Sequence, residues 1–184
     1  MSQPREPIYT IGHSNRDIDS FIELLRSFSI QTLVDVRAYP TSRRHPHFTA
    51  ASLQDTLSQA GIGYQWAGRD LGGHRKGKPN SIYAALKSAA LRAYADHMQT
   101  PPFVSAAAEL VTTTIRSRTA VMCAEKQPAQ CHRSLLSDYL LMRGASVLHI
   151  LDAEVAIEHE RPLFARVEQG CLIYDEPIQA QLYL

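Results

Sequence analysis

The sequence predicts an α/β fold: a single three-layer domain with a mostly parallel sheet between two layers of helices. Two observations predict it. Short apolar runs typical of strands alternate with helical patterns along the chain, and 45% of the 184 residues are apolar. Parallel strands need crossover connections, and a chain of this length can bury one core. We expect residues 1–184 to form one domain with five strands, or six if the C-terminal part adds one.

Five short runs rich in β-branched and aromatic residues are the predicted strands. They cover residues 8–11, 31–36, 62–66, 119–123 and 146–151. After residue 152 the patterns weaken, and we expect only a short helix and a strand near 171–174.

Amphipathic patterns predict helices in the connections between these strands. The first follows residue 17, and the second begins at Thr49 and ends at Gly61. A third begins at Ser81 and carries Tyr83 and Leu86 on its inner face, and the pair of prolines at 101–102 separates it from a fourth. The last covers residues 132–143 and has Gly144 after it.

The overall composition excludes a strongly basic or acidic protein. Nineteen Lys and Arg residues oppose eighteen Asp and Glu, which gives a net charge of +1, so any anion site must be local. The N-terminus has no apolar core typical of a signal peptide, and no apolar run approaches the roughly 18 residues of a membrane span. We therefore expect a soluble cytoplasmic protein with no membrane partner. The odd number of cysteines, three, predicts reduced thiols.

Polar residues follow the first four predicted strands. In an open parallel sheet the carboxyl ends of the strands meet at one edge, where ligands bind. The residues in these positions are His13 and Ser14; Asp35, Arg37, Ser42 and Arg43; Gly72 and Gly73; and Cys123, Glu125, Cys131, His132 and Arg133. An alternative for Ser14 is a structural one, because Ser14-x-x-Asp17 can form a capping box.

Four of these stretches form a recognisable ordered set of motifs. They are Thr10-Ile11-Gly12-His13-Ser14; Asp35-Val36-Arg37 followed by Pro40, Ser42-Arg43 and Phe48; Leu71-Gly72-Gly73; and Cys123-Ala124-Glu125 with Cys131-His132-Arg133. The set resembles that of the family called domain of unknown function 488, over about residues 8–151. The resemblance implies a compact α/β domain with a site, but no established reaction. Residues 152–184 form a C-terminal extension outside the resemblance.

The expected site includes an anion-binding part. Residues 131–133 open a helix, whose free N–H groups and positive dipole end favour an anion near Arg37, Arg43 and Arg133. Ser14, Asp35, Ser42, Gly72 and Gly73 are the expected neighbours in that part of the site. The glycine-rich loop at 67–80 matches neither G-x-x-x-x-G-K-[ST] nor G-x-G-x-x-G, which argues against a P-loop NTPase and a dinucleotide oxidoreductase.

The expected catalytic residues are His13, Glu125, Cys131 and His132. A thiol at a helix N-terminus beside His and Arg has a lowered pKa, so Cys131 is the expected nucleophile. The two histidines titrate near neutrality and can transfer protons, and Glu125 can orient them or simply pair with an arginine. The spacing is not the C-x5-R loop of cysteine phosphatases, because the sixth residue after Cys131 is Ser137.

A metal site is the less favoured interpretation of the same residues. Cys123, Cys131 and His132, joined by His13, offer the sulfur and nitrogen ligands that zinc or iron prefers. However, C-x7-C-H is not a recognised ligand spacing, and neighbours at a helix start diverge by about 100°. We therefore expect no metal, and the sequence implies no particular cofactor.

These observations predict a protein that binds a phosphate-bearing ligand, a nucleotide or nucleic acid, as an enzyme or an enzyme-like domain. One alternative is a non-catalytic nucleic-acid-binding module that uses the basic loops at 37–44 and 69–78. A further alternative is a metal- or thiol-dependent redox protein. The sequence does not indicate an oligomeric state.

Overall fold

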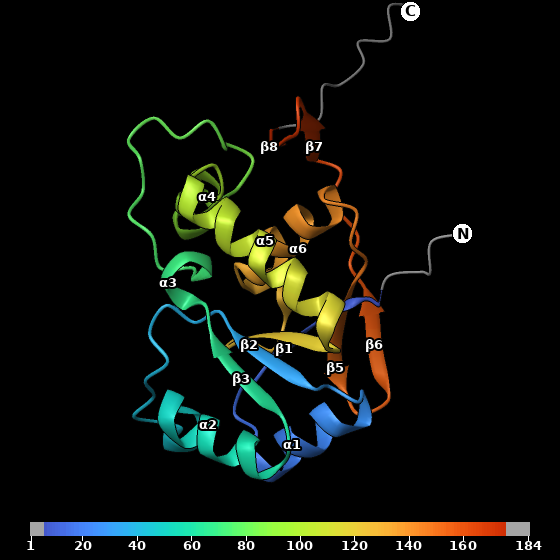
Figure 1. Cartoon of the computed structure of the whole chain (residues 1–184). Coiled ribbons are helices and arrows are strands. Elements are labelled where there is room, and N and C mark those ends of the chain that lie inside the picture. Colours follow the sequence, from blue (N-terminus) through green and yellow to red (C-terminus); the bar gives the residue numbers. More distant parts are fainter. Residues whose placement is uncertain (1–5, 176–184) are drawn as a thin grey trace, which may run out of the picture.

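A central sheet of six strands organises the structure, a computed structural model that describes residues 6–175 (Figure 1). The strand order is β3-β2-β4-β1-β5-β6. Five strands are parallel: β1 (Ile8–Gly12), β2 (Thr32–Asp35), β3 (Gly63–Trp66), β4 (Thr119–Cys123) and β5 (Val147–Asp152). They lie where the sequence predicted strands, and the mostly parallel α/β sheet is confirmed.

Helices cover both faces of this sheet (Figure 1). On one face lie α1 (Ile18–Ser27) and α2 (Ala50–Gln59), and on the other lie α3 (Gly68–Leu71), α4 (Ala89–Met98), α5 (Pro101–Arg116) and α6 (Arg133–Met142). Short 3₁₀ turns, η1 (Pro46–Phe48) and η2 (Pro128–Gln130), precede α2 and α6. Because side chains alternate along a strand, Met122 faces the core under α1 and α2, whereas Val121 and Cys123 face the core under α6.

The helix predicted from Ser81 is wrong in its start. The chain from 81 to 88 is irregular, and α4 begins at Ala89 with the Ser88 hydroxyl accepting a hydrogen bond from Leu91 N. The apolar spacing at Tyr83 and Leu86 reflects burial, since both side chains lie in the core without a helical backbone. Arg92 stabilises this conformation, because its Nη1 donates to the Leu86 carbonyl at 2.6 Å.

The C-terminal part adds strands that differ from those expected. The sixth strand of the sheet is β6 (Val155–Glu158), which pairs antiparallel with β5. The strand predicted near 171–174 exists as β8 (Cys171–Tyr174), but it pairs with β7 (Ala165–Glu168) in a separate two-stranded sheet. The short helix expected in this part is not found between residues 153 and 175, and residues 176–184 lie outside the described residues.

The chain leaves β4 toward one face of the sheet, whereas it leaves the two strands beside β4, which are β1 and β2, toward the other face. After β1 and β2 the chain enters α1 and α2, whereas after β4 it enters α6 on the other face. In an open parallel sheet this arrangement opens a crevice beyond the carboxyl ends of the strands. The residues that follow β1, β2 and β4 therefore share one crevice.

A chain of buried polar side chains connects α6 to the sheet. Arg133 Nη1 donates to Thr10 Oγ1 at 3.2 Å, and Thr10 Oγ1 lies 2.6 Å from His149 Nδ1. The other nitrogen of that ring, His149 Nε2, lies 2.9 Å from His159 Nδ1. Since Thr10 and His149 lie on the α6 side of adjacent strands, the strand register brings them together.

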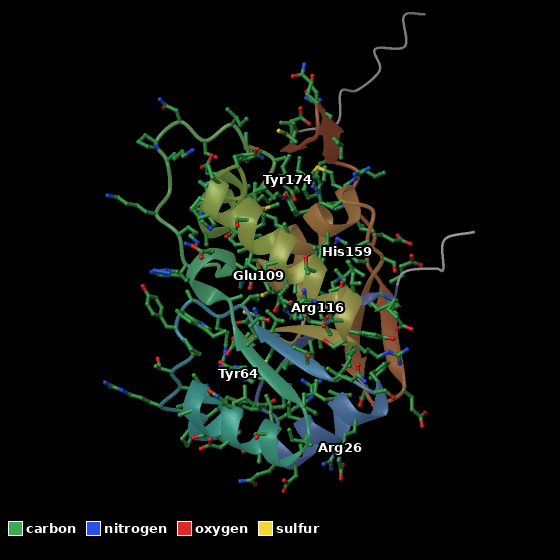
Figure 2. The ribbon with its side chains drawn as sticks, in the orientation of Figure 1. Arg26, Tyr64, Glu109, Arg116, His159 and Tyr174 are labelled. Carbon is green, nitrogen blue, oxygen red and sulfur yellow. The ribbon has the colours of Figure 1, made fainter. Side chains whose placement is uncertain are left out.

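The same chain of polar groups continues into the C-terminal part. His159 Nε2 and the Tyr174 hydroxyl each bind one oxygen of Asp138, both at 2.9 Å. Asp138 lies on α6, and Figure 2 shows His159 and Tyr174 on the side of the molecule where this helix lies. The buried carboxylate of Asp138 therefore holds β8 and the segment after β6 against α6.

This buried network makes stability depend on pH. Burial, followed by the charges of His159 and Arg133, lowers the pKa of His149 from 6.5 to about 4, against a smaller opposite effect of Cys131. Between pH 6.5 and pH 4 the unfolded chain then binds more protons than the folded protein, so stability falls as the pH decreases. We expect His149 to account for a loss of about 2 kcal/mol between pH 7 and pH 5. Urea unfolding at the two pH values measures it.

A variant and a control isolate this contribution. In His149→Gln the stability difference between pH 7 and pH 5 should shrink by about 2 kcal/mol. His74→Gln changes an exposed side chain and should keep the wild-type difference. An unchanged pH dependence in His149→Gln would contradict the assignment.

Within residues 6–175, none of the helices has the length and apolar character needed to cross a membrane.

Candidate functional site

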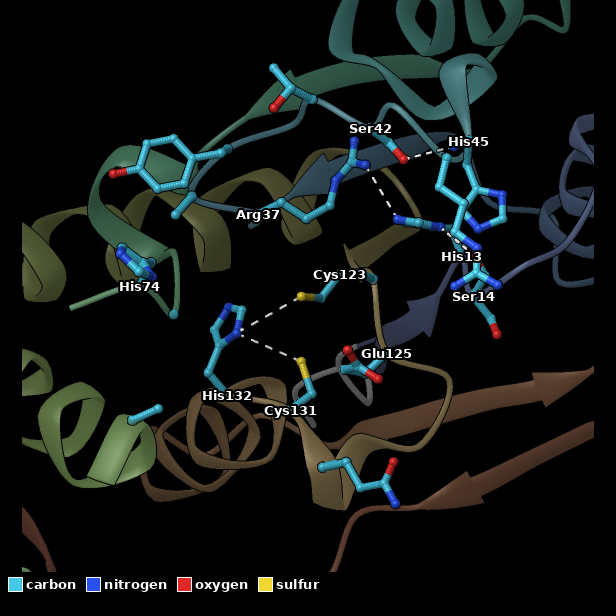
Figure 3. Close-up of a pocket in the computed structure, with 18 of the residues that line it drawn as sticks. His13, Ser14, Arg37, Ser42, His45, His74, Cys123, Glu125, Cys131 and His132 are labelled. Atoms are coloured by element: carbon cyan, nitrogen blue, oxygen red, sulfur yellow. Dashed lines mark hydrogen bonds between the residues drawn. The ribbon is translucent and has the colours of Figure 1, made fainter. Parts of the chain in front are cut away.

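A cavity of about 1060 Å³ lies beyond the carboxyl ends of β1, β2 and β4 (Figure 3). Nine residues named from the sequence line it: His13, Ser14, Arg37, Ser42, Gly73, Cys123, Glu125, Cys131 and His132. Main-chain hydrogen bonds hold the strand ends around it. Val36 N donates to Met122 O at 2.9 Å, and His13 N donates to Cys123 O at 3.0 Å. The cavity therefore has a wall formed by residues 13–45 and an opposite wall formed by residues 123–132.

Arg37 is buried in the first wall. Its Nε donates to Asp35 Oδ1 at 2.9 Å and its Nη2 to Asp35 Oδ2 at 2.6 Å. Asp35 is fully buried and also accepts hydrogen bonds from Arg37 N and from the Tyr64 hydroxyl. Arg37 Nη1 lies 3.3 Å from His13 Nε2. Within residues 6–175 these contacts use three of the five guanidinium N–H donors, so two remain for a ligand.

His13 is neutral at pH 7 and holds Arg37 in place. Burial, followed by the charge of Arg37, lowers the pKa of His13 from 6.5 to about 4. Its Nδ1 lies 2.8 Å from Ser14 O, so Nδ1 carries the proton and Nε2 accepts from Arg37. The ring stacks on Phe48 with its centroid 4.3 Å away. In this arrangement the Nε2 lone pair of His13 is used by the hydrogen bond from the guanidinium.

Cys123, Cys131 and His132 form a cluster in the opposite wall, which Figure 3 shows as two sulfurs directed at one imidazole. Nδ1 of His132 lies 3.9 Å from Cys123 Sγ and 3.6 Å from Cys131 Sγ. The expected divergence of residues 131 and 132 is wrong. Cys131 is extended, with φ −132° and ψ 149°, and only His132 has a helical conformation, so the two neighbouring side chains converge.

The two thiols have opposite pKa shifts. The hydrogen bond from Cys123 lowers the pKa of Cys131, and His132 and Arg133 lower it further against the effect of burial. The same hydrogen bond, followed by burial, raises the pKa of Cys123. The main-chain N–H of Arg133 also donates to Cys131 Sγ at 3.5 Å. Negative charge in this pair therefore lies on Cys131.

Four of the predicted anion-binding residues do not line the cavity. Asp35 lies behind Arg37, and Gly72 packs against the main chain of Ala38. Arg133 is buried, and its guanidinium binds Thr10 and the carbonyls of Glu125 and Lys126. It therefore positions the 125–126 turn, because α6 packs with this side chain directed into the sheet. The side chain of Arg43 is exposed outside the cavity.

The cavity also contains residues that were not among the predicted site residues. Arg44 lines it in place of Arg43, and His45 and His74 also lie on its lining. Tyr39, 69% exposed, pairs edge to face with His74 at 5.5 Å. The signal in the sequence for Arg44 and His45 is the density of basic residues, two Arg and two His, between 43 and 47. Ser14 does not cap α1, since Asp17 accepts the hydrogen bond from Ser20 N.

The fold and the cavity define an α/β protein with an open, mostly parallel sheet and a polar site beyond the carboxyl ends of its strands. Residues 17–140, more than half of the chain, match the model of the family described as Domain of unknown function DUF488. The chain therefore belongs to this family, as the ordered motifs indicated. No curated protein and no solved structure is significantly similar to the chain.

Proposed function

We propose that the protein is an enzyme that binds a phosphate-bearing ligand, a nucleotide or the end of a nucleic acid, in this cavity. One observation carries the proposal: two free N–H donors of Arg37 and the Cys123–Cys131–His132 cluster lie on opposite walls of one cavity. An anion held by Arg37 would lie between the two walls. The cluster would then supply the reactive groups, with the Glu125 carboxylate beside them.

The surroundings of Arg37 favour a phosphate over a small carboxylic acid. Arg44, His45 and His74 add cationic or protonatable groups at the rim, which suits a ligand with several anionic oxygens. The volume of about 1060 Å³ accommodates more than inorganic phosphate. Tyr39 offers an exposed aromatic face on which a base can stack. Together these features support a nucleotide.

Binding of the four ribonucleoside 5′-monophosphates by calorimetry tests the proposal. We expect Arg44→Gln to weaken binding about five-fold, because an ionic contact of an exposed side chain, of about 1 kcal/mol, is lost. Arg43→Gln is the matched control, since the neighbouring side chain is exposed outside the cavity, and it should bind like the wild type. No binding at low salt, or equal weakening in both variants, would refute the proposal.

A second candidate is a non-catalytic nucleic-acid-binding module. It is favoured by Arg43, Arg69, Lys76 and Lys78, which are exposed outside the cavity in the two basic segments, 37–44 and 69–78. Such contacts weaken steeply with salt because each releases counterions. Binding of a short oligonucleotide but of no mononucleotide, with Arg43→Gln and Arg44→Gln equally impaired, would select this candidate.

A further inference from the structure

We propose that Cys123, Cys131 and His132 bind one Zn²⁺ ion through their two sulfurs and the imidazole Nδ1, with a fourth coordination position open to the cavity. The ion would face the ligand of the proposed function. Zinc binding does not depend on that ligand, however, and the two are tested separately.

The distances between the three donor atoms fit a tetrahedral zinc ion. Bond lengths of about 2.3 Å to sulfur and 2.0–2.1 Å to nitrogen give edges of about 3.8 Å between two sulfurs and about 3.5 Å between sulfur and nitrogen. Here Nδ1 of His132 lies 3.6 Å from Cys131 Sγ and 3.9 Å from Cys123 Sγ, and the three donors lie within 4.8 Å of one another. The three donor atoms would need to move by a few tenths of an ångström up to about 1 Å to reach these tetrahedral distances.

The environment of His132 fits a metal ligand. The ring is buried and directs Nδ1 toward the two sulfurs, whereas Nε2, on the other side of the ring, has no hydrogen-bond partner within the described residues. Tyr94 packs edge to face on the ring with centroids 4.9 Å apart. A Cβ at Gly73 would lie 2.6 Å from His132 Cγ and closer to Nδ1, so glycine makes room for the ring. This gives one of the two motif glycines a role in the cluster.

Positive charge near the cluster supports two thiolates. The main-chain N–H of Arg133 donates to Cys131 Sγ. The buried guanidinium of Arg133 donates hydrogen bonds to Thr10 and to the carbonyls of the 125–126 turn. A Zn²⁺ ion neutralises two thiolates, whereas without an ion a second buried thiolate would be unpaired. Hydrogen bonds from main-chain N–H groups to ligand atoms are a typical outer shell of metal sites.

The open fourth position distinguishes this cluster from a structural zinc site. Structural sites have four protein ligands, whereas catalytic sites have three and leave one position for water or substrate. All three residues line the cavity, on the side opposite Arg37. With zinc bound, Cys131 is a ligand, which replaces the role of nucleophile that the sequence suggested.

The test uses the full chain purified without an affinity tag, in the presence of a non-chelating reductant. After removal of metals by a chelator and dialysis, zinc is added and its content is measured by elemental analysis. We expect one ion per chain. With Co²⁺ as a probe, thiolate-to-cobalt charge-transfer absorption should appear in the near ultraviolet. Less than one ion per five chains, or a cobalt spectrum without sulfur ligation, would overturn the proposal.

Variants identify the ligands. Cys123→Ser and Cys131→Ser should each weaken zinc binding at least 100-fold, whereas Cys171→Ser, an exposed thiol outside the cluster, should bind like the wild type. Gly73→Ala leaves both thiols intact but displaces the His132 ring, so it should weaken binding about ten-fold with the charge-transfer band retained. Equal losses in Cys171→Ser would refute the assignment. Nucleotide binding with no zinc binding would reject the metal site alone.

Discussion

Replacing Arg37 by Gln is expected to lower the free energy of unfolding by about 3–5 kcal/mol and to abolish ligand binding. The loss is large because Asp35 is fully buried and its carboxylate would lose the guanidinium that pairs with it. The remaining donors to this carboxylate are the Tyr64 hydroxyl and the main-chain N–H of residue 37. Urea unfolding measures the stability, and calorimetry with nucleoside monophosphates measures the binding.

A double variant separates the two roles of Arg37. In Asp35→Asn/Arg37→Gln no buried charge remains unpaired, so much of the stability should return while binding stays lost. Arg118→Gln is the control for removal of an ion pair: Arg118 and Glu6 are partly exposed, and the loss should be less than about 1 kcal/mol. If Arg37→Gln is as stable as Arg118→Gln, the buried pair does not hold this wall of the cavity.

Replacing Gly12 by Ala is expected to lower the free energy of unfolding by about 3 kcal/mol or more. Gly12 is the last residue of β1, and a Cβ there would collide with the carbonyl oxygen of Glu125 and lie 2.5 Å from its carbonyl carbon. The neighbour is main chain and cannot rotate away, so the 125–126 turn beyond β4 must move away from the end of β1. Because Arg133 also binds this carbonyl, the variant should distort both walls of the cavity.

Gly63→Ala is the matched control for this substitution. Gly63 is also in a strand of the same sheet, but a Cβ there would make ordinary contacts, the nearest with Thr32 Oγ1 at 3.5 Å. Its stability should lie within about 1 kcal/mol of the wild type. Thermal unfolding of both variants measures the difference, and equal stabilities would contradict the proposed collision at Gly12.

The strands and the place of the site could be predicted from the sequence because both depend on local patterns. β4 has the bounds predicted from its apolar run, and parallel strands necessarily bring His13, Arg37 and Cys131 to one edge. The spacing of Tyr83 and Leu86 in the sequence also indicated that both are buried. Their non-helical backbone could not be predicted, because it depends on Arg92, which donates hydrogen bonds to the carbonyls of residues 86 and 87.

The directions of individual side chains could not be predicted. Arg43 and Arg44 are adjacent, and only the path of the loop decides which one enters the cavity. Arg133 is turned away from the cavity because α6 packs it against Thr10, a contact across 123 residues. Cys131 and His132 converge because α6 begins at Arg133, one residue after the predicted start. Cys131 is therefore extended, and the side-chain spacing of a helix does not apply to this pair.

The buried polar network from Arg133 to Tyr174 shows that the cavity depends on residues on both sides of the segment that matches the family. The residues matching the family, 17–140, include α6 up to residue 140 but not Thr10, His159 or Tyr174, and they exclude β1 and His13, which follows it. A chain shortened to those residues would leave Asp138 with neither its His159 nor its Tyr174 contact and would remove β1, β5 and β6 from the six-stranded sheet. The segment by which the family is recognised is therefore narrower than the segment that assembles the cavity.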